Sequence, residues 1–293
     1  MSGPAQESGQ AAAAAPAGAG RRGGLGQGWP LLGLGLAMLA LMLALTVFAP
    51  LVAPYDPSAT SPDSLAPASA AHWLGTDSSG RDVLSRLIVG GRTTLLITVA
   101  AVLIALVAGL ILGLAAGYLG GRTDEIVMRL LDVVFAFPVL LLAIAVVAAL
   151  GPTVPNLILT IAIVYTPAMA RVVRAPVLSV KRWDHVEAAR SVGMSEMRLV
   201  LRHILPIVVS PILVATSLTL SQTIFTVTAL SFLGLGPPPP DPNWGGMLSE
   251  ARQFMELAPL TVIGPAAAIV FATLTFIIIA NGLREVLDVG SVR

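Results

Sequence analysis

The residue types that perform most protein chemistry are scarce in this chain, and their placement excludes several kinds of active site. There is no cysteine, which excludes disulfides, thiol nucleophiles and cysteine-ligated zinc. The three histidines, His72, His185 and His203, are far apart in the sequence, so local spacing assembles no metal site. A phosphate-binding P-loop needs Gly-Lys followed by Ser or Thr, whereas the single lysine, Lys181, lies between a valine and an arginine. The chain therefore has no Walker-type ATPase of its own, and any nucleotide energy must come from a partner.

The most varied set of polar and small residues lies between residues 175 and 206, and its first half predicts a short helix. Asp184 and Glu187 have the spacing of a helix N-cap followed by an acid at the third helical position, which would satisfy free backbone N–H groups reciprocally. Gly193 can end this helix by adopting a left-handed conformation.

The second half of the same segment predicts an amphipathic helix that Pro206 ends. Its apolar side chains recur at i, i+3, i+4 and i+7: Met197, Val200, Leu201 and Ile204. Arg198 and Arg202 lie four residues apart on the polar side. By shape alone, two such helices either lie in a lipid interface and anchor the protein, or offer an apolar ridge with a charged rim to another protein.

The elements that must position these residues are membrane helices. Of 293 residues, 56% are hydrophobic and only 11% are charged, whereas a soluble domain has about 25% charged residues. Because a bilayer core needs about 20 apolar residues per helix, we expect an all-α polytopic helix bundle with six transmembrane helices. The expected spans are residues 31–53, 94–118, 127–150, 156–174, 207–231 and 260–282.

The distribution of basic residues predicts the orientation of this bundle. Thirteen would be cytoplasmic if the N-terminus is inside: Arg21, Arg22, Arg122, Arg129, Arg171, Arg174, Lys181, Arg182, Arg190, Arg198, Arg202, Arg284 and Arg293. Four would be outside: Arg81, Arg86, Arg92 and Arg252. The positive-inside rule therefore places both termini in the cytoplasm.

The same pattern divides the chain into three parts. Residues 1–29, rich in Ala, Gly and Pro, are predicted to be a disordered cytoplasmic tail. Residues 30–93 would hold the first transmembrane helix, retained and not cleaved, and a long external loop. Residues 94–293 would form a five-helix core that includes the folded cytoplasmic loop 175–206.

Two spans have periodic patterns of their own. In the second, small residues recur every four positions and predict a close packing seam, with a partner in this chain or in another subunit: Ala101, Ala105, Gly109, Gly113 and Gly117. In the fifth, hydroxyls recur at a/d-like intervals: Thr216, Thr219, Thr223 and Thr226. Hydroxyls in a membrane either bond to neighbouring helices or line a wet path, and our hypothesis is that this stripe lines a translocation pathway.

Ionisable residues are almost absent from the spans. Asp132 is expected to pair with Arg129, three residues earlier, near the cytoplasmic end. No carboxylate or histidine relay crosses the membrane, which argues against a proton-coupled secondary transporter and an intramembrane protease. Outside the membrane, Gly80-Arg81-Asp82 predicts the start of an external helix. This helix would serve either in gating or receptor contact, or only as a structural corner.

The loop 175–206 resembles a known motif. Glu187-Ala188-Ala189, then Gly193, then Leu205-Pro206 is similar to the EAA loop through which ABC-transporter membrane subunits engage their ATPase. One departure is His203, where the family usually has Ile.

Further segments resemble the dipeptide/oligopeptide/nickel branch of these permeases, of the type with a short tail and a long first external loop. They are His72 to Asp77, Gly80 to Leu87, Arg129 to Asp132 with Pro138, and Leu230 to Gly236 with Trp244-Gly245. Val227 stands where this branch often has an acid.

The resemblance implies a type I ABC importer permease fold and a multi-pass subunit of the cell (inner) membrane that is not an enzyme. The ATPase-coupling residues would be Glu187, Ala188, Ala189, Arg190, Gly193, Arg198, Arg202, Leu205 and Pro206. Implied partners are a second homologous permease chain, two ATP-binding subunits that hold ATP and Mg, an external solute-binding protein and membrane lipid. No cofactor is expected in this chain, and no nucleic acid. The substrate would be a di- or oligopeptide, or nickel or another small solute; the alternatives are a secondary transporter and a non-transporting membrane scaffold.

Overall fold

The computed structural model describes residues 28–290, and within them the chain is helical without a β-strand. The helices are α1 (Gly28–Val47), α2 (Ala49–Val52), α3 (Val83–Leu119), α4 (Gly121–Phe135), α5 (Val139–Leu150), α6 (Val154–Val180), α7 (Asp184–Ser191), α8 (Glu196–Leu199), α9 (Leu205–Phe232), α10 (Trp244–Ala251) and α11 (Leu260–Gly290). A π-helical turn (Val200–Ile204) joins α8 to α9, and a 3-10 turn (Arg252–Phe254) follows α10. The predicted all-α bundle is confirmed, while the tail predicted for residues 1–29 lies almost wholly outside the described residues.

Within residues 28–290, five helices are long and apolar enough to cross a membrane, and a sixth span is possible as a bent pair. The pair is α4 and α5, whose axes differ by 85°. The break falls at Pro138, where the missing N–H and the restriction on the preceding residue interrupt the helix. The span expected at residues 127–150 is therefore two helices. Four of the other expected spans each fall within one long helix, whereas the first, residues 31–53, runs past the end of α1 at Val47 and through the short α2.

The small-residue stripe of the second span is a packing seam, as predicted, and its partner is α6 of the same chain. All five of its residues are buried. A Cβ added at Gly113 would lie 2.5 Å from the carbonyl oxygen of Ala170, and one at Gly117 would lie 2.9 Å from Val177. The absence of side chains thus lets the two helices meet backbone to backbone.

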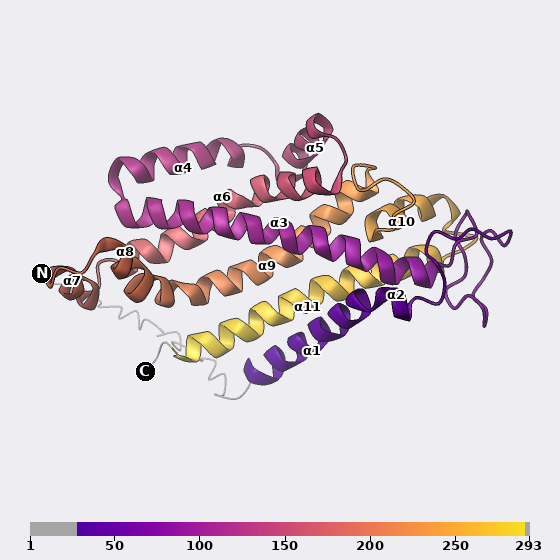
Figure 1. Cartoon of the computed structure of the whole chain (residues 1–293), viewed down its shortest axis with the longest axis horizontal. Coiled ribbons are helices and arrows are strands. Elements are labelled where there is room, and N and C mark those ends of the chain that lie inside the picture. Colours follow the sequence, from indigo (N-terminus) through magenta and orange to yellow (C-terminus); the bar gives the residue numbers. More distant parts are fainter. Residues whose placement is uncertain (1–27, 291–293) are drawn as a thin grey trace, which may run out of the picture.

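A second close contact joins the first and last helices. Figure 1 shows α1 alongside α11. A Cβ at Gly35 would lie 2.7 Å from Ile279, and one at Gly282 would lie 2.6 Å from the backbone nitrogen of Leu32. Glycine on each helix therefore brings α1 against α11, although the two are at opposite ends of the sequence.

The bundle has two ends with different structures (Figure 1). We call the end formed by α7, α8 and the start of α9 the α7 end, and the end formed by α2, the loop before α3 and α10 the α10 end. The helix α3 begins at Val83, so the helix predicted from residue 80 is continuous with the second expected span. The helix start itself was predicted correctly, because Asp82 accepts hydrogen bonds from the backbone N–H (2.8 Å) and hydroxyl (2.7 Å) of Ser85.

Candidate functional site

The first helix of the loop 175–206 begins one residue earlier than the sequence suggested. The N-cap of α7 is Trp183, which makes no side-chain capping bond, and its carbonyl accepts from Val186 (2.9 Å) and Glu187 (3.1 Å). Asp184 is therefore already in the first turn, and the predicted capping box is wrong. The carboxylates of Asp184 and Glu187 still lie beside the positive end of the helix dipole, where negative charge is favourable.

Gly193 ends α7 as predicted. Its φ is +80°, and its N–H donates to Arg190 (3.0 Å) while Met194 donates to Ala189 (3.3 Å). These two bonds form a Schellman motif, which satisfies carbonyls at the end of the helix. No atom lies within 4 Å of an added Cβ, so glycine is required by the backbone conformation and not by crowding.

The second amphipathic helix differs from the prediction in two ways. It does not end at Pro206, because α8, the π-turn and α9 form one continuous helix and Pro206 lies in the first turn of α9. Its buried residues are Leu199 and Ile204, whereas Met197 is 71% exposed and Leu201 is 54% exposed. The reason is the π-turn, in which residues five apart share a face.

Apolar packing holds this helical hairpin onto the bundle. The side chains of Val186, Leu199 and Ile204 are fully buried in one cluster with Val173 and Val177 of α6. The apolar face of the hairpin is thus covered by protein. Its position is fixed by the helices that cross the membrane, α6 before it and α9 after it.

Polar contacts fix the same hairpin to the end of α3. The Lys181 ammonium donates to the carbonyls of Gly117 (2.6 Å) and Tyr118 (3.3 Å), which lie in the last turn of α3. Burial, with a smaller contribution from Arg182, lowers the pKa of Lys181. Arg190 donates to the hydroxyl of Tyr118 (3.3 Å) and faces its ring. The lone lysine therefore acts as a C-cap for α3.

The predicted ion pair between Arg129 and Asp132 is not formed. Arg129 pairs with Glu125 at 3.2 Å, one turn earlier on α4, and Asp132 pairs with Arg171 of α6. Both observed pairs bring the charged groups closer together than the predicted pair would. The i,i+4 spacing places Glu125 beside Arg129, and α6 packs against α4, which places Arg171 beside Asp132. Asp124 likewise pairs with Arg174 of α6.

Most of the predicted coupling residues are exposed at the α7 end. Seven are exposed: Glu187, Ala188, Arg190, Gly193, Arg198, Arg202 and Pro206. Ala189 is buried and Leu205 is half-buried. A shallow groove of about 560 Å³ is lined by Ser195, Met197, Arg198, Leu201, Arg202 and Pro206. We call these exposed residues, with the groove, the α7 surface.

Apolar groups on the α7 surface were not predicted as exposed. Val192 is 83% exposed, and it joins Met197 and Leu201 on this end of the molecule. A periodicity argument assigned Met197 and Leu201 to the buried face. Leu201 lies within the π-turn, which changes the face that its side chain occupies, and Met197 lies in α8 just before it. The result is a surface of apolar side chains beside arginines, the composition that interface centres favour.

The hydroxyl stripe of the fifth span lies in α9. Thr219, Thr223 and Thr226 are buried and Thr216 is half-buried. Thr216 donates to the carbonyl of Ile212 (2.7 Å), and Thr226 shares a hydrogen bond of 2.8 Å with Tyr165 of α6. Part of the stripe thus bonds within the chain, and whether it lines a pathway stays a prediction.

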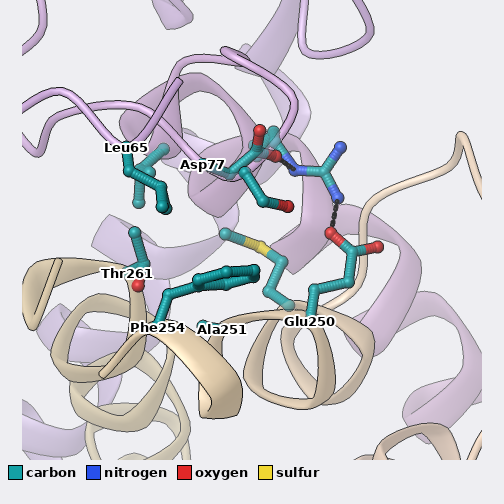
Figure 2. A pocket seen from close by; sticks show the side chains of 10 residues that line it. Leu65, Asp77, Glu250, Ala251, Phe254 and Thr261 are labelled. Atoms are coloured by element: carbon teal, nitrogen blue, oxygen red, sulfur yellow. Dashed lines mark hydrogen bonds and ion pairs between the residues drawn. The ribbon is translucent and has the colours of Figure 1, made fainter. Parts of the chain in front are cut away.

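The α10 end contains a buried ion-pair cluster. Arg81 pairs with Asp77 (2.7 Å) and Glu250 (2.9 Å), and Arg86 pairs with the same two acids at 3.4 and 3.0 Å. Figure 2 shows Asp77 and Glu250 joined through a guanidinium above a pocket that Leu65, Phe254 and Thr261 also line. These four charges connect the start of α3 to α10.

These features define the class as a polytopic membrane protein with a polar helical hairpin that is held on two of its spanning helices. Residues 105–290 match the family described as the binding-protein-dependent transport system inner membrane component. Residues 30–67 match the N-terminal transmembrane domain of oligopeptide transport permease C. The chain belongs to this family of ABC-transporter permeases, in its dipeptide/oligopeptide branch.

Similar proteins are found among enterobacterial relatives. The glutathione transport system permease protein GsiD of Escherichia coli strain 536 is 46% identical over 250 residues, which cover 85% of this chain and 82% of that protein. The GsiD protein of Pectobacterium atrosepticum is 45% identical over 220 residues, covering 75% and 73%. A crystal structure of an amino acid ABC transporter has a TM-score of 0.53 at 21% identity, covering 66% of this chain and 90% of that one, and supports the type I importer fold.

Proposed function

We propose that this chain is one of two permease subunits of an ATP-driven importer that takes up short peptides. The observation that carries the proposal is the α7 surface, where exposed charged and apolar side chains stand on a hairpin fixed to two spanning helices. The glutathione transport named for the relatives supports a peptide substrate over nickel. An external solute-binding protein would deliver it.

The α7 end would face the cytoplasm. In the described residues, the basic residues predicted to be inside lie on α4, α6, α7, α8 and α11, in the turn between α6 and α7, and in the π-turn before α9. The four predicted outside lie on α3, just before it, or just after α10. The positive-inside rule then directs the α7 end inward and the α10 end outward.

Two partner subunits would bind ATP and Mg and dock on the α7 surface of each permease. Glu187, Arg190, Arg198 and Arg202 would form its charged contacts, and Met197 and Leu201 its apolar ones. When the ATPases close, they would displace α7 and α8 together, because Val186 and Leu199 are buried in one cluster.

The displacement would reach the membrane through α9. The helix runs without interruption from Glu196 to Phe232, so the α8 segment at the ATPase and the threonine stripe belong to one element. A helix transmits a rigid-body movement along its axis, and movement at one end must move or bend the rest. In this mechanism the stripe of Thr216, Thr219, Thr223 and Thr226 lines the pathway that opens and closes.

The test is uptake by the complete importer, reconstituted in liposomes with its ATPases and binding protein. Glu187→Arg reverses an exposed charge on the α7 surface and is expected to abolish ATP-driven peptide uptake. Glu256→Arg, at an exposed position of the α10 end, is the matched control and should leave uptake intact. Normal uptake by Glu187→Arg, or uptake driven by an ion gradient without ATP, would contradict the proposal.

The pathway assignment needs a separate test. Single cysteines at Thr219 and Thr223 are expected to react with water-soluble thiol reagents in one state of the transport cycle and not in the other. The chain has no native cysteine to interfere. Cysteines that stay unreactive through the whole cycle would show that these hydroxyls only bond to neighbouring helices.

A further inference from the structure

One side of α9 is not covered by the other described residues of the chain. From residue 217 to residue 228, four side chains are not buried: Leu218, Leu220, Gln222 and Phe225. Phe225 is 69% exposed, and Gln222 is exposed as well. The two are three residues apart, so they lie on the same side of the helix. An apolar ring and a polar amide are therefore presented together on a helix that crosses the membrane.

The open side of α9 follows a heptad repeat. Its residues are all exposed or half-buried, and their spacing alternates between four and three: Pro211, Ala215, Leu218, Gln222, Phe225 and Ala229. We call these six residues the α9 heptad face. The face extends over about 27 Å of helix at a rise of about 1.5 Å per residue. Side chains at this spacing form the row along which one helix packs against another.

Gln222 lies deep in the membrane. The continuous helix runs from Glu196 to Phe232, so Gln222 is ten residues from one end and 26 from the other. These separations are about 15 and 39 Å, whereas the bilayer core is about 30 Å thick. The backbone carbonyl of Gln222 accepts from Thr226 (3.2 Å), but its side-chain amide enters no hydrogen bond of the described residues. Facing lipid, this amide would be left without a partner, which is unfavourable.

The shape of the face also suits a helix. Ala215 and Ala229 are small, and small residues at an interface let two membrane helices approach closely. A groove of about 280 Å³ lies between α9 and α11 and is lined by Pro211, Ala215 and Leu218 of the face, with Leu287 opposite them. Side chains of a second helix can enter this groove as knobs enter holes. One polar residue in a heptad row, here Gln222, fixes the register and the choice of partner.

We propose that the α9 heptad face packs against a membrane-spanning helix of the second permease subunit, which brings a polar side chain to the amide of Gln222. The inference rests on the proposed function, because it takes the second permease from there. Among the partners in that importer, the ATPases and the binding protein lie outside the membrane. Only the second permease can therefore reach the depth of Gln222. The hydrogen bond between the two helices sets their register.

The first test is photo-cross-linking in the complete importer, embedded in lipid nanodiscs. Benzoylphenylalanine at Leu218 or at Phe225 is expected to give a product that contains this chain and the second permease, identified by mass spectrometry. The matched control is Leu213, which is 43% exposed on the same helix. It lies two residues from Pro211 and from Ala215, about 200° around the helix from each. Leu213 should give little of this product.

A second test addresses the close approach at Ala215. Ala215→Leu places a large side chain between the two helices, so the amount of the second permease that co-purifies with this chain should fall strongly. Leu213→Phe adds volume at the control position and should leave co-purification unchanged. An equal fall in both variants would mean that any added volume on α9 disturbs assembly, and would overturn the assignment of the face.

A third test removes the polar group. Gln222→Leu keeps the size of the side chain and loses its amide. Against lipid this change would be neutral or favourable, whereas against a polar partner it should weaken association of the two permeases by about three- to thirtyfold, the effect of one hydrogen bond between membrane helices. The measurement is energy transfer between labelled subunits in liposomes. Unchanged or stronger association would contradict the pairing at Gln222.

The cross-linking result decides the proposal independently of transport. Products with lipid alone, or with a second copy of this chain alone, at both Leu218 and Phe225 would overturn it while leaving the proposed function standing. Absence of ATP-driven peptide uptake by the wild-type importer would instead refute the proposed function. Cross-links from the α9 heptad face to the second permease would still establish the contact between the two helices in that case.

Discussion

The two ends of the bundle place their charges in opposite ways. At the α10 end, Arg81, Arg86 and Asp77 are buried and pair with each other and with Glu250. At the α7 end, Glu187, Arg198 and Arg202 are exposed, and apolar side chains are exposed beside them. Buried charges are costly unless each has a partner, so the α10 end is built to hold one arrangement within the chain. Exposed charges and apolar groups are free to pair with another protein.

Removing a buried charge at the α10 end is expected to have the largest effect on the stability of the protein. Asp77→Ala leaves Arg81 and Arg86 with one acid between them and removes the carboxylate that accepts from Ser79 (2.8 Å). Removing one partner of a buried pair costs about 3–5 kcal/mol. We expect a large fall in the thermal unfolding midpoint of the purified protein. Asp63→Ala, at an exposed position of the same loop, should have almost no effect, and equal midpoints for the two variants would contradict a structural role for the cluster.

At the α7 end, stability depends on apolar packing under the surface. Leu199 is fully buried with Val186 and Val177. Leu199→Ala is expected to cost about 3 kcal/mol, the usual effect of truncating a core leucine. The measurement is again the unfolding midpoint. A change no larger than that of an exposed residue would mean that the hairpin does not pack on α6.

The hydrogen bonds between Lys181 and α3 are expected to contribute less to stability than the packing of Leu199. Lys181→Gln loses a charged donor to the carbonyls of Gly117 and Tyr118, and one such hydrogen bond contributes about 1.5–3 kcal/mol before exposure reduces it. We expect about 1 kcal/mol because Lys181 is only partly buried. Arg182→Gln at the exposed neighbouring position is the control. An equal loss of stability in both variants would show that the lysine is no more important than any nearby positive charge.

The sequence was sufficient for features that one helix determines by itself. Small residues every four positions define a single face of a helix. The seam through Gly113, and the close approach of another helix to α3 along it, could therefore be predicted. The left-handed end of α7 was equally predictable, because glycine is the residue that this backbone conformation favours. The spans followed from apolar runs that only a membrane or a large core can cover.

Features that depend on pairing between distant segments were not predictable. Arg86 and Glu250 are 164 positions apart, and Asp132 and Arg171 are 39 positions apart. No local spacing selects these partners. The π-turn at Val200–Ile204 is a related case: a periodicity of 3.6 residues assigns Leu201 to the buried face, and inserting one wider turn exposes it.

The smallest expected effect on stability tests the α7 end most directly. Leu201 is 54% exposed and lines the groove of the α7 surface, two residues from the buried Leu199. Leu201→Ser should change the free energy of unfolding by less than about 0.5 kcal/mol, because the residue has little packing to lose. If an ATPase covers this groove, the same change should reduce ATP-driven uptake by the complete importer strongly, as truncation at an interface centre does. Reduced uptake at unchanged stability assigns Leu201 to the interface with the ATPase. Unchanged uptake would mean that the groove stays exposed in the assembled importer and that coupling depends on the charged residues alone.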